Sequence, residues 1–178
     1  MSFPKLNPIL GVCVKLYEVT SEVEVLEVFR LAEAAGLARV VTAASDRLVW
    51  RWLGTSRFHD TRELTRRALA VQAVPDPGTL VAAGRAAQAV GDLGQALDYY
   101  NQALPIQRQV GDRAGEAVTR YNIAMIQRDL GNLAEAVAQL EQTVELDRQI
   151  QHPDLAADTQ MLHQIRQELS HSDERRDS

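Results

Sequence analysis

Two stretches of the sequence repeat one another at a distance of forty residues. The first, "GDLGQALDYYNQALPIQRQVGDRAGEAV", begins at Gly91, and the second, "GNLAEAVAQLEQTVELDRQIQHPDLAAD", begins at Gly131. When the two glycines are aligned, Ala96 coincides with Ala136 and other apolar positions coincide as well. A repeat of this length is one supersecondary unit that cannot bury its apolar face alone, so neighbouring copies have to stack. The duplication therefore predicts an array of packed units.

Each copy predicts two helices joined by a tight turn at its glycine. Apolar residues recur at helical three- and four-residue spacing on both sides of the turn. Gly91 and Gly131 suit the residue after a helix, where φ is positive, and Asp92 or Asn132 suits the N-cap of the next helix. A Gln or Glu three residues later completes a capping box in each copy, at Gln95 and Glu135.

Small residues near the predicted helix crossings support this interpretation. Ala124 and Ala136 in the second copy take the places of Gly84 and Ala96 in the first, and each pair lets two helices approach closely. The composition agrees, because apolar residues make up 46% of the chain but aromatic residues only 5%. Such a composition favours helices over sheets. We therefore predict an all-α fold.

These small residues and turn glycines resemble the tetratricopeptide repeat over residues 77–148. That repeat has a consensus period of 34 residues. A period of about forty resembles the longer variant of kinesin light chains and of many bacterial signalling proteins. The resemblance implies a right-handed α-solenoid of stacked antiparallel helix hairpins.

The repeat register predicts the organisation of the flanking chain within a single α-solenoid domain, 1–178. Before the clear repeats, Leu48, Val49 and Trp52 take helix core positions of a degenerate repeat in which Ser56 replaces the turn glycine. Thr20 or Ser21 is expected to cap a helix that Gly36 ends. The predicted segments are a divergent hairpin (7–36), a degenerate repeat (41–73), two repeats (77–110 and 113–150), a capping helix (154–169) and a disordered polar tail (170–178).

The stretch "VLEVFRLAEAAGLARVVTAASDRLVWRWLG", together with "GDRAGEA", resembles the helical arrays of bacterial STAND-type signalling proteins. The likeness implies a role in bacterial signalling. The nucleotide-binding motif GxxxxGK[ST] does not occur in the sequence. We therefore expect any associated ATPase to be a separate chain or to be absent.

Charge and hydropathy narrow the possible partners. The formal net charge is −5, with 19 Lys and Arg scattered among 24 Asp and Glu, which argues against nucleic acid as a ligand. No stretch has the roughly 18 uninterrupted apolar residues that a membrane helix needs, so we expect no membrane association. The single cysteine, Cys13, suits a reducing compartment and is expected to be a small buried hydrophobe, with a thiol nucleophile as the alternative. These features predict a cytoplasmic protein.

The sequence contains no pattern of catalytic or metal-binding residues. None of the four histidines, His59, His152, His163 and His171, has a second His or Cys at a metal-ligand spacing. Acidic pairs near helix starts, such as Glu22 and Glu24, suit the helix dipole better than acid–base catalysis. We predict that the protein is not an enzyme and has no cofactor or metal site.

The tetratricopeptide resemblance implies a concave binding groove lined by the first helix of each hairpin. An extended peptide or a helix suits such a groove, with arginines pairing with carboxylates and amides contacting backbone. For each arginine and glutamine of the groove, an ordinary solvated surface is the alternative role, and for Trp50 and Tyr121 the alternative is packing in the core. The predicted groove residues are Arg47, Trp50, Arg85, Gln88, Tyr121, Asn122, Met125, Arg128 and Gln164.

These observations lead to three hypotheses of function. The first is a scaffold, adaptor or sensor arm that binds a protein or peptide of acidic or amphipathic character in the groove. The second is a regulatory module that responds to a small ligand or a signalling peptide. The third is self-association into a homo-oligomer through the apolar ends of the solenoid.

Overall fold

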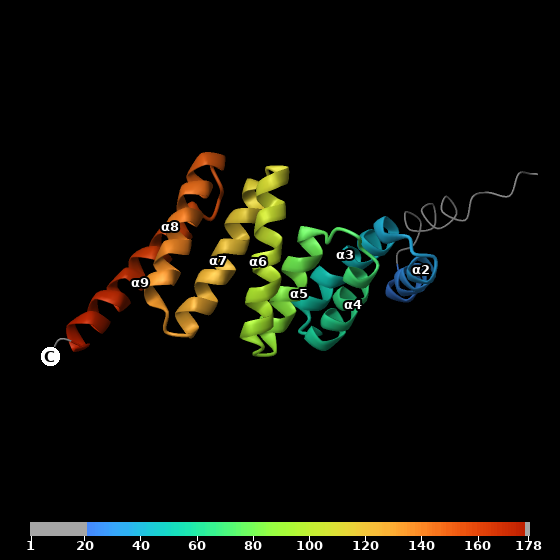
Figure 1. Cartoon of the computed structure of the whole chain (residues 1–178), viewed down its shortest axis with the longest axis horizontal. Helices are drawn as coiled ribbons and strands as arrows, with labels where there is room; N and C mark the ends of the chain where they lie inside the picture. The colour runs from blue at the N-terminus through green and yellow to red at the C-terminus, as the bar shows by residue number, and fades with distance from the viewer. Residues whose placement is uncertain (1–20, 177–178) are drawn as a thin grey trace, which may run out of the picture. The chain divides into compact units, whose positions relative to one another are not determined.

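A computed structural model describes residues 21–176 of the chain. This part is helical and contains no strand. Figure 1 shows the helices in chain order, coloured from blue to red. Their bounds are α2 (Glu22–Ala34), α3 (Ala38–Gly54), α4 (Phe58–Ala70), α5 (Pro77–Ala89), α6 (Leu93–Val110), α7 (Arg113–Asp129), α8 (Leu133–Ile150) and α9 (Leu155–Arg176).

The chain divides into two compact units. Unit 1 is Met1–Gly91 and unit 2 is Asp92–Ser178. The boundary falls at the turn glycine of the first clear repeat. In repeat proteins each element contacts only its neighbours, so the contact network has no central core to join distant parts of the chain. Each unit therefore has a core of its own.

The helix ends confirm most of the turn chemistry expected from the sequence. Ser21 caps α2 in a full capping box with Glu24, which settles the choice between Thr20 and Ser21. The turn glycines have positive φ, +83° at Gly91 and +78° at Gly131. Asp92 caps α6 by accepting a hydrogen bond from the Gln95 backbone N–H at 3.2 Å.

The capping box predicted at Asn132 is wrong. Asn132 occupies the N-cap position of α8, but its side chain makes no capping hydrogen bond. Its amide Nδ2 instead donates to Oε1 of Gln127 at 2.9 Å. Gln127, near the end of α7, therefore binds the side chain that was expected to cap α8.

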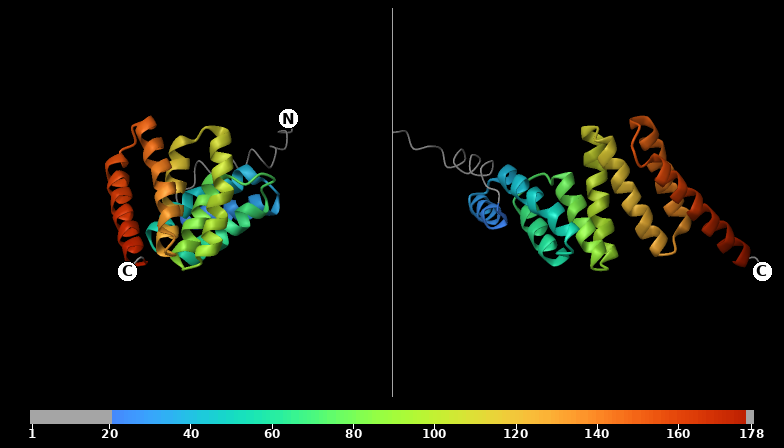
Figure 2. Two further views of the ribbon diagram at one scale, coloured as in Figure 1. Left: turned by 60° about the vertical axis from the view of Figure 1, so that its left-hand side comes forward. Right: turned by 180° about the vertical axis from the view of Figure 1, so that it is seen from behind.

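Unit 1 is held together by one apolar core. Leu48, Val49 and Trp52 of α3 are buried, as the degenerate repeat predicted. They share this core with Phe29 of α2 and Leu64 of α4. In Figure 2, α3, α4 and α5 lie side by side, and all three helices contact one another.

Unit 2 has a second core at the contacts of α7 with α8 and of α8 with α9. Ala124 of α7 and Ala136 of α8 have no exposed surface, as expected for residues at a close helix crossing. Leu140 of α8 and Leu162 and Ile165 of α9 complete the cluster. The last helix therefore covers an apolar face of the repeat that precedes it.

The last helix is longer than the sequence predicted. The polar composition of the tail predicted that the capping helix ends at residue 169, but α9 continues to Arg176. No glycine or proline interrupts residues 170–176. Ser170 also donates a hydrogen bond to the Gln167 carbonyl at 2.9 Å, which suits a continuing helix. At the other end, Cys13 and the first half of the hairpin expected at 7–36 lie outside the described residues.

The turn between α3 and α4 offers a test of the repeat register. Ser56 has a φ of +59°, in the place where the clear repeats have glycine. A side chain in this conformation costs about 1 kcal/mol. We expect Ser56→Gly to raise the free energy of unfolding by about 0.5–1 kcal/mol. The relief of backbone strain in the folded state exceeds the destabilisation that the added entropy of the unfolded chain causes. Urea unfolding measures the change.

The reverse substitution at the equivalent turn is the matched control. Gly131 has a φ of +78°, and no atom lies within 4 Å of the position that a Cβ would take, so Gly131→Ser introduces backbone strain without a clash. It should lower stability by a similar amount. Equal destabilisation by both substitutions contradicts the assignment of Ser56 to the glycine position.

Candidate functional site

The predicted groove residues fall into two groups, one in each unit. The Trp50 patch consists of Arg47 and Trp50 on α3 with Arg85 and Gln88 on α5, and these two helices are in contact. The Tyr121 patch consists of Tyr121, Asn122, Met125 and Arg128 on α7 with Gln164 on α9. In both groups the side chains come from helices that are not consecutive in the chain.

Trp50 is a surface residue whose ring contacts the guanidinium group of Arg85. Its side chain is 48% exposed, whereas Trp52, two positions later, is buried in the core of unit 1. The guanidinium carbon of Arg85 lies 5.3 Å from the centroid of the Trp50 ring. This distance is within the range of a cation–π contact. Of the two roles open from the sequence, core packing is therefore wrong for Trp50.

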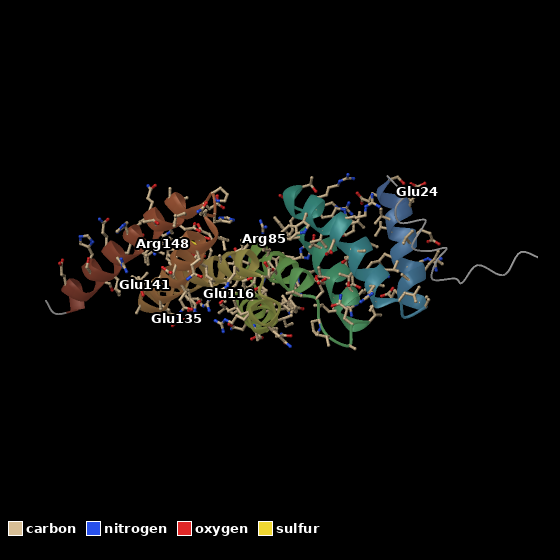
Figure 3. All side chains as sticks on the ribbon, turned by 90° about the horizontal axis from the view of Figure 1, so that it is seen from above. Glu24, Arg85, Glu116, Glu135, Glu141 and Arg148 are labelled. Carbon is tan, nitrogen blue, oxygen red and sulfur yellow. The ribbon has the colours of Figure 1, made fainter. Side chains whose placement is uncertain are left out.

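Arg85, labelled in Figure 3, lies on α5 with an exposed side chain. No carboxylate of the described chain forms an ion pair with it. Arg47 is exposed and Gln88 is half-buried, and both already take part in interactions within the protein. The tryptophan face and the Arg85 guanidinium are thus the parts of this patch best placed to meet a ligand.

An acidic residue on the same turn of α3 modifies the patch. Removal of water by the surrounding protein, followed by the negative charge of Asp76, raises the pKa of Asp46 to about 6. Asp46 therefore loses its proton as the pH rises through about 6. Above that pH its charge offsets part of the positive charge supplied by Arg47 and Arg85.

The Tyr121 patch lies partly inside the core of unit 2. Tyr121 and Met125 are half-buried and pack against the cluster that contains Ala124 and Leu162. Tyr121 therefore packs against the core with part of its side chain, the alternative role expected from the sequence, and leaves the rest exposed. The Nδ2 atom of Asn122 is buried and has no hydrogen-bond acceptor in the described chain.

Arg128 already has a carboxylate partner. Its Nε donates to Oε2 of Glu168 at 2.9 Å and its Nη2 donates to Oε1 of the same group. The guanidinium holds the pKa of Glu168 below its ordinary value. Gln164 also donates to Glu168, at 3.2 Å. The expected pairing of Arg128 with a ligand carboxylate thus competes with an internal ion pair between α7 and α9.

Three carboxyl groups at the α8–α9 connection were not predicted from the sequence as part of this region. Asp147 lies near the end of α8, Asp154 in the connection and Asp158 on α9. Burial, the hydrogen bond with Asp147 and the charge of Asp147 raise the pKa of Asp158 to about 7. Burial and then the charge of Asp158 raise the pKa of the Tyr121 phenol. The phenol and the carboxyl groups therefore share one electrostatic environment.

Residues 21–176 do not provide a metal centre or a membrane helix. No grouping of His, Cys, Asp or Glu there has an arrangement that could hold a metal ion. Within the same range, none of the helices has the length and apolar character required to cross a bilayer.

Comparison with protein families identifies the repeats. Residues 76–149 match the model of the tetratricopeptide repeat. A search of curated protein sequences gave no match.

Comparison with solved structures gave 14 matching chains. One belongs to a Podosopora anserina protein described as a kinesin light chain with nearly identical tetratricopeptide-like repeats. It is 20% identical, with a TM-score of 0.60 over 72% of this chain. The match spans 65% of that chain, less than two thirds of its length. At this identity the likeness shows the fold alone, an α-solenoid.

The raised pKa of Asp158 predicts a pH-dependent effect on stability. The ordinary value is 3.8 and the folded value is about 7, so between these values the folded state holds a proton that the unfolded state releases. Folding stability contributed by this group is complete below pH 3.8 and is lost as the pH rises to about 7. Asp158→Asn removes the carboxyl group whose ionisation destabilises the folded state. The variant should therefore gain stability relative to the wild type as the pH rises across this range.

Urea unfolding of both proteins at pH 5 and pH 8 measures this difference. The advantage of Asp158→Asn should be larger at pH 8. Asp98→Asn, at an exposed acid of α6, is the control and should show no such trend. An advantage that is the same at both pH values contradicts the prediction.

Proposed function

We propose that this protein is a non-enzymatic scaffold that binds a peptide segment of another protein, because residues 76–149 match the model of the tetratricopeptide repeat. Repeats of this family serve in general as protein-interaction surfaces. We assign the binding to the groove lined by the first helix of each hairpin, with the Trp50 patch as the principal contact. An adaptor or a sensor arm is the role that such binding serves.

The observation that carries this proposal is the exposed tryptophan beneath Arg85. A large aromatic side chain that is 48% exposed presents apolar surface to water that a partner can cover. The cation–π contact restricts the ring before binding, so less side-chain freedom is lost when a ligand docks. Tryptophan and arginine are also the residue types most enriched among energetic hot spots of interfaces.

The chemistry of the patch suggests the class of partner. The face of Trp50 accepts an apolar or aromatic side chain, and the guanidinium of Arg85 can receive a carboxylate in a bidentate manner. An amphipathic segment with an acidic residue next to an apolar one supplies both groups. Such a segment can bind as an extended strand or as a helix.

Peptide selection against the whole chain tests the proposal. We expect a peptide-display library to yield sequences with paired apolar and acidic residues, whose affinity calorimetry then measures. Trp50→Ala should weaken binding roughly 30-fold, because truncating a hot-spot tryptophan costs about 2 kcal/mol or more. Arg85→Ala should weaken acidic peptides more than neutral ones.

Val74→Ala is the control, since Val74 is another exposed apolar residue of unit 1 and lies outside the patch. It should leave affinity unchanged. Light scattering of the free protein identifies self-association, in which case the apolar surfaces serve a second copy. Selected peptides that bind Trp50→Ala as tightly as the wild type refute the role of the Trp50 patch.

A further inference from the structure

A cavity of about 270 Å³ opens at the connection between α6 and α7, within unit 2. Its lining consists of Gln107, Arg108, Gly111, Arg113 and Glu116. Binding sites for small molecules are concave, with a few polar groups that converge on one space. The α6–α7 cavity has both properties, and its volume restricts the occupant to a small molecule.

Gln107 gives the cavity a buried polar group whose oxygen lacks a donor. The residue is 3% exposed, and its Oε1 is buried and accepts no hydrogen bond from the described chain. Its Nε2 lies 2.9 Å from the position that a Cβ at Gly115 would take, so the glycine leaves room for the amide. A buried acceptor without a donor is costly. The last torsion of a glutamine side chain is broad, so the amide can turn its oxygen towards a donor in the cavity.

Two arginines supply further donors to the same cavity. Arg108 is exposed and donates through Nε to Oε1 of Glu116 at 2.8 Å. Arg113 is exposed and donates through Nη1 to Oε1 of Gln149 at 3.2 Å. A guanidinium group has five N–H donors, so each arginine keeps donors for an occupant of the cavity.

The charges in and next to the cavity favour an anion. Oε1 of Glu116 also accepts hydrogen bonds from Nε of Arg120 at 3.0 Å and from Nη2 of Arg120 at 2.9 Å. Asp112, the N-cap of α7, accepts a hydrogen bond from the Gly115 backbone N–H at 2.9 Å. Three arginines therefore accompany two carboxylates that already have donors. The remaining positive charge attracts a negatively charged ligand.

We propose that the α6–α7 cavity binds a small carboxylate that carries a hydrogen-bond donor, a hydroxyl or an ammonium group, on the adjacent carbon. The carboxylate accepts hydrogen bonds from Arg108 and Arg113, and the adjacent donor bonds to Oε1 of Gln107. One ligand thus provides the anion and the missing donor together. The cavity belongs to unit 2, so this binding is additional to the peptide binding assigned to the Trp50 patch of unit 1.

Nuclear magnetic resonance of the whole chain with isotope-labelled glutamine and arginine side chains tests the cavity. The probes are L-lactate and L-alanine, which share the carboxylate and differ in the adjacent donor. The control is propionate, which differs from L-lactate only in lacking the hydroxyl. L-lactate or L-alanine should shift the side-chain amide signal of Gln107 and the Nε signal of Arg113. Propionate should bind roughly tenfold more weakly than the better probe, because it leaves the buried oxygen without a donor.

Three variants sharpen the outcome. Arg113→Gln removes one guanidinium group from the cavity and should weaken the better probe roughly tenfold. Arg148→Gln is the matched control, because Arg148, labelled in Figure 3, is also exposed but pairs with Glu145 on its own helix, outside the cavity. It should bind the probes as the wild type does. Gln107→Leu removes the buried acceptor, so it should bind L-lactate and propionate equally.

Thermal unfolding without any probe verifies that each variant is folded. Absence of a Gln107 shift with both L-lactate and L-alanine, equal affinity of the wild type for propionate and the better probe, or undiminished binding by Arg113→Gln would each overturn the proposal. Trp50→Ala should bind the probes as the wild type does. Failure of the carboxylate site is therefore distinguishable from failure of the peptide-binding proposal.

Discussion

The close approach of α7 and α8 at Ala124 and Ala136 is the contact on which the rest of unit 2 depends. Neither alanine has exposed surface, and both belong to the cluster that receives Leu162 and Ile165 of α9. A larger residue at either alanine separates the two helices and opens the surface that α9 covers. The position of α9 in turn decides how far Tyr121 is buried. The exposure of Tyr121 therefore depends on two methyl groups at a helix crossing.

Buried charge in unit 2 is treated in two opposite ways. Glu116, labelled in Figure 3, is nearly buried, and its Oε1 accepts hydrogen bonds from Nε of Arg108 at 2.8 Å and from Nε of Arg120 at 3.0 Å. Arg120 also donates to Gln139 of α8 at 2.8 Å. This network joins three helices through complementary charges. Asp147, by contrast, is 1% exposed and forms no ion pair with an arginine or lysine of the described chain. Its neighbour Asp158 has a pKa raised by burial and by Asp147.

The repeat made the helices predictable, because turn chemistry and apolar spacing act over a few residues. Gly131 and Asp92 behave as their local sequence requires. Asn132 does not, since Gln127 of the preceding helix takes its amide, and a side-chain competition of this kind leaves no mark in the spacing. The end of α9 was also missed. Polar composition alone does not end a helix, and nothing in residues 170–176 breaks one.

The predicted site residues were harder to judge, because a ligand-binding role depends on which side chains remain unpaired. The resemblance to known repeats selected Arg85 and Arg128 equally. Only the structure shows that Arg128 already forms an ion pair with Glu168. Glu168 lies in the last helix, which belongs to an incomplete repeat, so the repeat spacing does not predict this pairing. The carboxyl pair was detectable in principle, since Asp147 and Asp158 replace a glutamine and a threonine of the previous copy.

The two patches differ in charge, and this difference restricts the proposed partner. The Trp50 patch presents an arginine without a carboxylate partner in the described chain, whereas in the Tyr121 patch the arginine is neutralised and acids lie beside the tyrosine. A wholly acidic peptide suits the first surface but is repelled by Asp154 and Asp158 at the second. A wholly basic peptide has the reverse problem. The two surfaces, each taken by itself, therefore favour partner segments of opposite charge.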